Sequence, residues 1–341
     1  MSSFETSERK FATPDYGAAR RSNARSPGLI DLFLRRMSAL EGSVAGELAR
    51  PAEASSALGA AFLDVAREAW LLGSASVSGV ASQLGFLAPP ALHAGQTDEF
   101  GVDHEAAERM REWVRPIARG WLGLRDSADK RPPERGGVLV VCSRSAWPLA
   151  TEALVVHAAL ADRYAAGRPA YVLWDGGAPE LPWVSDTARR LGILAATAEN
   201  ARHLLERGAF VLAFPEGRAA CEKTYEKRYR VTRFAGGDLI GAAMNAGAAI
   251  IPAAVVGNEE SYPLLACPGG FPLTLQFPAT GLLGLAPLPL AWSVRLGAQV
   301  SYARDEQDDM QDSDAVVDAV RERIQAMLAE MLAARRSLVY G

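Results

Sequence analysis

Apolar and polar positions along this chain follow two different periods. Short continuous apolar runs, typical of strands buried on both faces, are separated by segments whose apolar residues recur every three or four positions, typical of helices. The expected strands are Val138–Val141, Ala170–Trp174, Ile193–Ala196, Phe210–Phe214, Ala249–Val256 and Trp292–Val300. The expected helices are Leu149–Tyr164, Val184–Leu191, Glu199–Gly208 and Phe234–Ala246. This alternation predicts an α/β fold with a central, mostly parallel sheet flanked by helices.

Two further helical stripes flank the alternating region. The first consists of Met110, Trp113, Val114, Ile117 and Trp121, and the second of Val317, Val320, Ile324, Leu328 and Met331. Six acidic residues between Asp305 and Asp314 precede the second stripe, and negative charge stabilises the beginning of a helix. Residues 258–290 are rich in Gly, Pro and Leu without a clear period. We expect this segment to lie over the domain and to offer an apolar surface to a substrate.

The first 95 residues differ from the rest. Residues 1–27 are polar with scattered charges and predict a disordered leader. Residues 28–95 are rich in Ala, Ser and Gly but carry a stripe that includes Leu58, Phe62 and Leu72, which predicts a helical N-terminal extension. Two roles stay open for it: packing on the main domain, or lying on a membrane surface. The main domain is expected to span 96–341.

Composition excludes several classes of protein. The 341 residues are 49% hydrophobic and 22% charged, with a formal net charge of −4. This mild acidity argues against nucleic acid as a partner, and three cysteines are too few for a disulfide framework. No secretory signal and no apolar stretch of about 18 residues is present, so membrane contact would be peripheral. We expect a cytoplasmic protein that contacts the inner face of a membrane.

The most informative segment is Gly208–Phe234. An expected strand runs directly into the sequence Phe-Pro-Glu-Gly at 214–217 and then into a cluster of Lys and Arg. Gly217 permits a tight turn or the close approach of a ligand. Arginine offers a planar fork and lysine a point charge, so the cluster suits a phosphate group. The alternative is a solvated basic face.

Six motifs in one order resemble the lysophospholipid acyltransferase family, within it a bacterial subgroup of PlsC-like phospholipid/glycerol acyltransferases. They are DEFGVD (98–103), ENARHLLERG (199–208), FPEG (214–217), KTYEKRYRVTRF (223–234), IIPAAVVGNEESYPLL (250–265) and PLPLAWSVRLG (287–297). The resemblance covers roughly residues 98–300. It implies a glycerolipid acyltransferase-like fold for the domain. It also implies an enzyme of phospholipid biosynthesis that transfers a fatty acyl group from acyl-CoA or acyl carrier protein to a lysophospholipid or glycerolipid hydroxyl.

The resemblance also implies a substrate-binding block around the FPEG turn. Its expected members are Phe214, Pro215, Glu216, Gly217, Arg218 and Lys223, with an arginine holding the acceptor phosphate. The family pattern places that arginine two residues after the glycine, where this chain has Ala219; Arg218 is displaced by one position. We expect no bound cofactor and no metal, because neither a dinucleotide fingerprint nor a metal-ligand spacing is present.

The catalytic slot differs from the family pattern in its chemistry. The resemblance implies an NH…D motif at the end of the first strand of the domain. Its histidine takes the proton of the acceptor hydroxyl, and its carboxylate orients the imidazole ring. Carried onto this chain, the asparagine slot is Ser143, the histidine slot is Arg144, and the carboxylate slot is Ala150 or Thr151. A guanidinium group has no acceptor lone pair. Arg144 therefore cannot act as the general base.

Candidate substitutes for the missing base lie elsewhere in the chain. His157, His203 and Glu152 are the first alternatives, followed by His93 and His104, and Cys142 offers a thiol nucleophile. Each also has an ordinary structural interpretation. Two functions therefore stay open: an acyltransferase with a rearranged site, or a catalytically inactive homologue that binds lipid phosphate or acyl-CoA without transfer.

Overall fold

A computed structural model describes most of the main domain. The described residues are 95–145, 151–175, 182–235, 237–266, 273–274, 287–288, 290–302 and 309–335. The expected leader at 1–27 and nearly all of the expected helical extension at 28–95 lie outside them. Within the described ranges, no helix combines the length and the apolar character that crossing a membrane requires.

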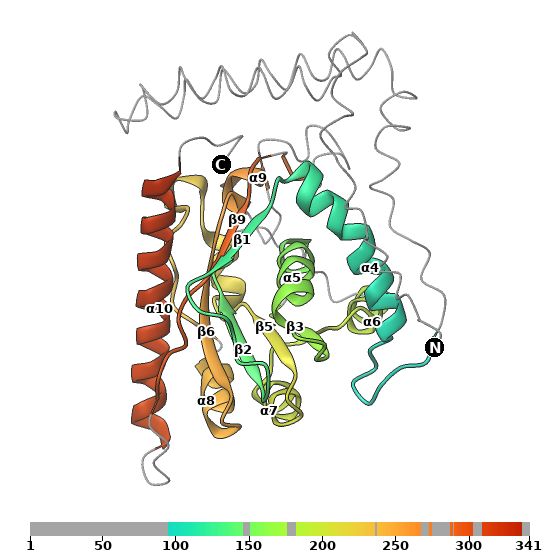
Figure 1. Ribbon diagram of the computed structural model, residues 1–341. Coiled ribbons are helices and arrows are strands. Elements are labelled where there is room, and N and C mark those ends of the chain that lie inside the picture. Colours follow the sequence, from blue (N-terminus) through green and yellow to red (C-terminus); the bar gives the residue numbers. More distant parts are fainter. Residues whose placement is uncertain are drawn as a thin grey trace, which may run out of the picture.

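A seven-stranded sheet forms the centre of the molecule (Figure 1). In spatial order its strands are β1 (Arg125–Ala128), β9 (Ser293–Leu296), β6 (Ala249–Val256), β2 (Val138–Cys142), β5 (Phe210–Ala213), β3 (Ala170–Trp174) and β4 (Ile193–Ala195). The strands from β6 to β4 are parallel to one another. β9 is antiparallel to β6, and β1 is parallel to β9. The prediction of a mostly parallel sheet is confirmed.

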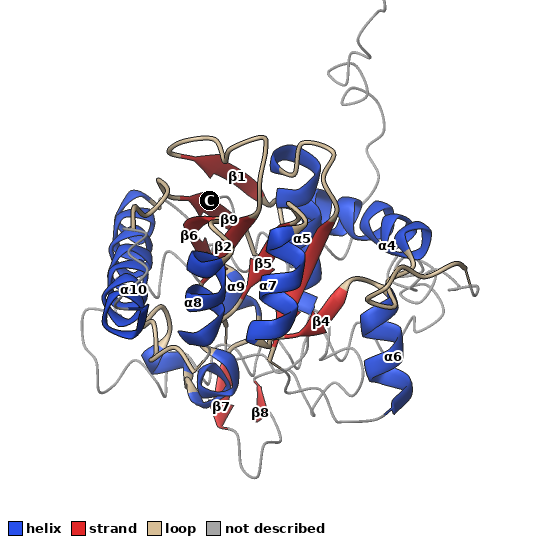
Figure 2. Ribbon diagram, turned by 90° about the horizontal axis from the view of Figure 1, so that it is seen from below, coloured by secondary structure: helices blue, strands red, loops and turns tan. Residues whose placement is uncertain are grey.

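Helices cover both faces of this sheet, which gives three layers (Figure 2). One face carries α4 (His104–Pro116), its continuation as the π-helix η3 (Ile117–Trp121), α5 (Thr151–Tyr164) and α6 (Pro182–Arg190). The other face carries α7 (Ala198–Glu206), α8 (Gly237–Asn245) and α10 (Asp309–Ala334). Shorter elements are η4 (Gly217–Glu222), η5 (Tyr225–Lys227), α9 (Asn258–Ser261), and a separate pair of strands, β7 (Leu264–Ala266) and β8 (Leu273–Thr274).

The central strands are apolar on both faces because both faces are covered. In β2, Val138, Val140 and Cys142 pack toward α4 and α5. Leu139 and Val141 pack toward α7, α8 and α10. All five side chains are fully buried. A continuous apolar run without alternation is therefore what this position in the sheet requires.

Most of the expected elements are present, and the differences have physical reasons. The observed bounds of β3 and β6 equal the predicted ones. β9 ends at Leu296, and beyond it Val300 keeps a single bridge to Ile250, so the expected strand to Val300 is too long. β1 was not predicted because Arg125–Ala128 is polar and lies at the edge of the sheet. Much of the expected covering segment 258–290 lies outside the described residues.

The DEFGVD motif has a structural role at the beginning of α4. The Asp98 carboxylate accepts the backbone N–H groups of Phe100 and Val102, each at 2.9 Å, which closes a tight loop. The Asp103 carboxylate caps α4 by accepting the Ala106 N–H at 2.9 Å. It also accepts a hydrogen bond from Arg190 of α6 at 3.0 Å. The motif therefore fixes α4 against α6.

Gly257 connects the end of β6 to α9 and tolerates no side chain. Its φ is +101°, and a Cβ there would lie 2.3 Å from the carbonyl oxygen of Ala291. We expect Gly257→Ala to reduce the free energy of unfolding by about 3 kcal/mol, because backbone strain and a steric clash add. Gly241 of α8 is the matched control, since a Cβ there meets no atom within 4 Å. Urea unfolding of both variants tests this: equal stability of the two would contradict it.

Candidate functional site

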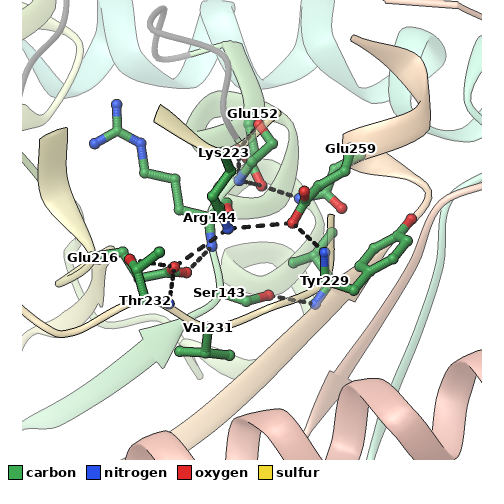
Figure 3. Close-up of polar contacts among 12 residues, drawn as sticks. Ser143, Arg144, Glu152, Glu216, Lys223, Tyr229, Val231, Thr232 and Glu259 are labelled. Carbon is green, nitrogen blue, oxygen red and sulfur yellow. Dashed lines mark hydrogen bonds and ion pairs between the residues drawn. The ribbon is translucent and has the colours of Figure 1, made fainter. Parts of the chain in front are cut away.

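The candidate site lies at the carboxyl ends of the parallel strands, the edge where open α/β sheets bind ligands. Its residues come from the loops that follow β2, β3, β5 and β6. Figure 1 shows α9, which follows β6, at this edge of the sheet, and Figure 3 shows the polar contacts among the side chains. The described part of this edge is filled by the protein's own charged groups.

Arg144, in the slot of the expected histidine, is fully buried. Its Nη1 donates to the carbonyl oxygen of Asp175 at 2.9 Å and to that of Gly217 at 2.7 Å. The guanidinium carbon lies 3.9 Å from the centroid of the Trp174 ring, a cation–π geometry. Arg144 therefore ties together the chain segments that follow β2, β3 and β5.

The carboxylate of Glu216 is the hub of the hydrogen bonds in Figure 3. Oε1 accepts the backbone N–H of Arg144 at 2.9 Å. Oε2 accepts both the N–H and the hydroxyl of Thr232, at 2.8 and 2.9 Å. The same oxygen lies 3.3 Å from Nζ of Lys223. Glu216 is fully buried, so these contacts replace all of its hydration.

Lys223 lies between two carboxylates. Its Nζ is 3.3 Å from Oε2 of Glu216 and 3.3 Å from Oε1 of Glu259, and it also donates to the carbonyl oxygen of Arg144. Burial lowers the pKa of Lys223, but the attraction of the two carboxylates outweighs burial and the pKa is raised. For Glu259 burial is the larger effect, and it raises the pKa of the carboxyl to about 7 against the opposing effect of Lys223.

A second buried carboxylate holds the beginning of α5. Glu152 accepts the hydroxyl of Ser145 at 2.6 Å and its backbone N–H at 3.0 Å. The side-chain amide of Asn258 also donates to Glu152. Burial raises the pKa of Glu152, and the hydrogen bonds from Ser145 oppose that rise. This carboxylate joins the loop after β2 to α9.

The network continues to the C-terminal helix. Tyr229 has a φ of +59°, its backbone N–H donates to Glu259 at 3.1 Å, and its hydroxyl contacts Glu260. The same hydroxyl accepts the N–H of Gly257 at 2.8 Å. Arg335, just after α10, donates to Glu260 at 3.1 Å. The site is thereby connected to α10.

The structure places most of the expected substrate-binding residues inside the protein. Phe214 and Glu216 are fully buried, Lys223 is 4% exposed, and Pro215 is buried. A Cβ on Gly217, whose φ is +53°, would lie 2.5 Å from Oδ2 of Asp175. Arg218 has its backbone in η4, and its side chain lies outside the described residues. Substrate contact by these six residues stays a prediction.

The other slots of the expected catalytic motif also have structural partners. The hydroxyl oxygen of Ser143 accepts the backbone N–H of Val255 in β6 at 3.0 Å. The hydroxyls of Thr151 and Tyr262 lie 3.3 Å apart. Ala150, the second candidate for the carboxylate slot, lies outside the described residues. The described slots therefore stabilise the fold at the carboxyl edge of the sheet.

The alternative bases and the thiol have other surroundings. His157 lies in the middle of α5 near the backbone of Ala170, where β3 begins, and burial lowers the pKa of His157 to about 4. His104 pairs with Asp98 at 2.8 Å, and His203 is on the surface of α7. Burial raises the pKa of the Cys142 thiol, and nearby carboxylates raise it further, which disfavours a thiolate nucleophile. His93 lies outside the described residues.

Sequence reasoning missed several members of the network. They are Thr232, Tyr229, Asn258, Glu259 and Glu260. The sequence did hold a signal: two adjacent glutamates follow the wholly apolar strand Ala249–Val256 after only Gly257 and Asn258. Carboxylates at the end of a buried strand need partners. In the described ranges, no cluster of three or more His, Cys, Asp or Glu is arranged to hold a metal ion.

Fold and site together define a three-layer α/β protein in which a buried ionic network fills the carboxyl edge of the sheet. No protein-family model matches the chain. It is 34% identical over 275 residues to the uncharacterized protein Rv0502 of Mycobacterium tuberculosis, a match that covers 77% of this chain and 76% of that protein. The uncharacterized protein ML2427 of Mycobacterium leprae is also 34% identical, over 77% and 75% of the two chains. The chain belongs to the family of these mycobacterial proteins.

A comparison with solved structures adds a distant likeness. The crystal structure of the 1-acyl-sn-glycerophosphate (LPA) acyltransferase PlsC from Thermotoga maritima aligns with a TM-score of 0.42 and 16% identity. The alignment covers 69% of this chain and 84% of that chain. A likeness this distant carries no conclusion about activity.

Replacement of Arg144 tests whether this residue is part of the fold. We expect Arg144→Ala to lower the free energy of unfolding by about 3–5 kcal/mol, because it removes two charge-assisted hydrogen bonds and leaves buried carbonyl groups unsatisfied. Arg144→Lys should recover only part of this, because an ammonium group lacks the planar fork. Urea unfolding gives both values.

Arg168 provides the matched control. It also donates to backbone carbonyl oxygens, those of Ala165 at 2.7 Å and Gly136 at 2.8 Å, but it is only partly buried. We expect Arg168→Ala to cost about 1 kcal/mol. If Arg144→Ala were no more destabilising than Arg168→Ala, a structural role for Arg144 would be excluded.

The raised pKa of Glu259 predicts a pH-dependent stability. Between about pH 4.5, where glutamate ionises in an unfolded chain, and about pH 7, the folded protein keeps a proton that the unfolded chain has released. Stability relative to Glu259→Gln should therefore fall by about 1–3 kcal/mol as pH rises through this window. Unfolding of both proteins from pH 4 to 8 measures the difference. A constant difference, or one that grows with pH, would contradict the assignment.

Proposed function

We propose that this protein binds a phosphorylated glycerolipid at the carboxyl edge of its sheet without transferring an acyl group to it. The observation that carries the proposal is the position of Arg144. The motif resemblance puts the general base there, and the side chain found there is a fully buried guanidinium bonded to two backbone carbonyl groups. A guanidinium cannot accept the proton of an acceptor hydroxyl.

The surroundings of Arg144 support the same proposal. Three ionisable groups close to Arg144, Glu152, Glu216 and Lys223, are buried, and each has hydrogen-bond or ion-pair partners within the protein. Their proton-binding atoms are already engaged in the fold. Since a positioned base contributes about 10²–10⁴-fold to a rate, transfer by the route of the resembling enzymes should fall by at least that factor.

The proposal assigns phosphate binding to Arg218, the residue that directly follows the buried FPEG turn. The six ordered motifs support a glycerolipid ligand, and Arg218 is the cation that the proposal places against its phosphate. The backbone of this turn is held rigidly, because Gly217 accepts from Arg144 and Pro215 accepts the N–H of Ala235 at 2.9 Å. A preorganised turn loses little conformational entropy on binding.

A paired assay tests the proposal. The full-length protein is incubated with lysophosphatidic acid and labelled palmitoyl-CoA to measure transfer, and each compound is titrated alone by calorimetry to measure binding. We expect saturable binding of lysophosphatidic acid and no transfer above the protein-free blank. Transfer above that blank would support the alternative, an acyltransferase with a rearranged site. Absence of binding to both compounds would overturn the proposal.

Arg218→Ala should weaken the binding of lysophosphatidic acid by about tenfold or more, because it removes a charge-assisted hydrogen bond to phosphate. Arg119→Ala, a change at an exposed arginine of η3, is the matched control and should bind as the unmodified protein does. Equal affinities of the two variants would show that phosphate is held elsewhere.

A further inference from the structure

The segment Tyr225–Ala235, here called the basic tract, is strongly positive in an acidic protein. It carries four cations, Lys227, Arg228, Arg230 and Arg233, and one acid, Glu226, whereas the whole chain has a net charge of −4. The proposed function does not use these cations. Positive charge concentrated in so short a stretch needs its own explanation.

The backbone of the basic tract is fixed from the protein side at several points. Gln325 of α10 donates to the carbonyl oxygen of Tyr229 at 3.0 Å and accepts the N–H of Val231 at 2.9 Å. Thr232 is bonded to Glu216 at both its N–H and its hydroxyl. Tyr229 and Phe234 are 6% and 7% exposed. These contacts anchor the tract to the core.

With the backbone anchored, the cations lie at the surface. Lys227, Arg230 and Arg233 are exposed, and in the part of the chain that the structure describes, no acidic side chain forms an ion pair with any of them. Some surface arginines elsewhere do have such partners: Arg115 pairs with Asp162 and Arg163 with Asp126, each at 2.8 Å. The three cations of the tract therefore keep their charge available to an external anion.

We propose that the basic tract binds the surface of an anionic lipid bilayer. This proposal rests on the proposed function, because a protein that takes a glycerolipid meets it at a membrane. Lys227, Arg230 and Arg233 recur at every third position and are all exposed, so their charges are distributed along the tract. A bilayer offers phosphates at repeated positions, and each basic residue near an anionic surface strengthens binding about fivefold.

The test uses the full-length protein and sedimentation with vesicles. One set of vesicles contains phosphatidylcholine alone, and the other contains equal parts of phosphatidylcholine and phosphatidylglycerol. The variant is Lys227→Gln/Arg230→Gln/Arg233→Gln. The matched control is Lys130→Gln/Arg131→Gln/Arg135→Gln, which removes the same types of charge from exposed positions in the loop before β2, at the opposite edge of the sheet. Thermal unfolding verifies that both variants are folded.

We expect the unmodified protein and the control variant to bind the anionic vesicles and to be released by 0.5 M salt. The partition coefficient of the tract variant on anionic vesicles should be about 100-fold lower than that of the unmodified protein. Equal losses in the two variants, or equal binding to both kinds of vesicle, would overturn the proposal.

Two further measurements separate this proposal from its alternatives. Adenosine 3′,5′-bisphosphate is titrated as a soluble polyphosphate: if it binds in a tract-dependent way while anionic vesicles do not, the partner is a soluble anion and the membrane proposal is wrong. Lysophosphatidic acid below its micellar concentration tests the lipid site alone. Retention of that binding in the tract variant, together with loss of vesicle binding, supports the surface role. Vesicle binding without monomer binding would contradict the proposed function and leave the tract assignment standing.

Discussion

The buried carboxylate of Glu216 is the constraint on which the carboxyl edge of the sheet depends. A carboxylate without water must be surrounded by donors, or its burial is too costly for the fold. Glu216 finds them in the backbone of Arg144, in both donors of Thr232 and in the ammonium group of Lys223. These donors come from three separate segments of the chain. One side chain therefore fixes the loop after β2 and the basic tract relative to the end of β5.

The cations of the network make contacts that are not interchangeable. Lys223 forms ion pairs with both Glu216 and Glu259. Arg144 instead donates hydrogen bonds to the neutral carbonyl groups of Asp175 and Gly217. Removal of one member would leave a buried group without its partner, which costs more than the contact itself contributed. The interior of this edge is accordingly a rigid structure. The proposed contacts with lipid and membrane therefore use groups at its outer surface, where the backbone of the basic tract is held from beneath by Gln325.

The layered fold could be predicted from the sequence because it depends on periodicity. Ala170–Trp174 and Ala249–Val256 read as buried strands and are β3 and β6, since strands covered on both faces must be apolar throughout. The edge strand β1 could not be predicted: its polar sequence Arg125–Ala128 is stabilised by pairing with β9, which lies far away in the chain. Motif reasoning pointed to Arg144 and the FPEG turn, and the structure brings these two together through the hydrogen bond from Arg144 to the carbonyl oxygen of Gly217. It did not find Glu259, because the partner that explains this carboxylate, Lys223, is 36 positions away.

The contacts of Arg144 mean that histidine could not simply take its place. An imidazole ring at this position would be shorter and could not reach the carbonyl oxygens of Asp175 and Gly217 with the two donor contacts that one guanidinium nitrogen makes here. The cation–π contact with Trp174 would change as well. A histidine would therefore require new partners for both carbonyl groups before it could act as a base. The arginine and the surrounding loops form one interdependent arrangement, in which a single substitution of Arg144 by histidine would not supply a positioned base.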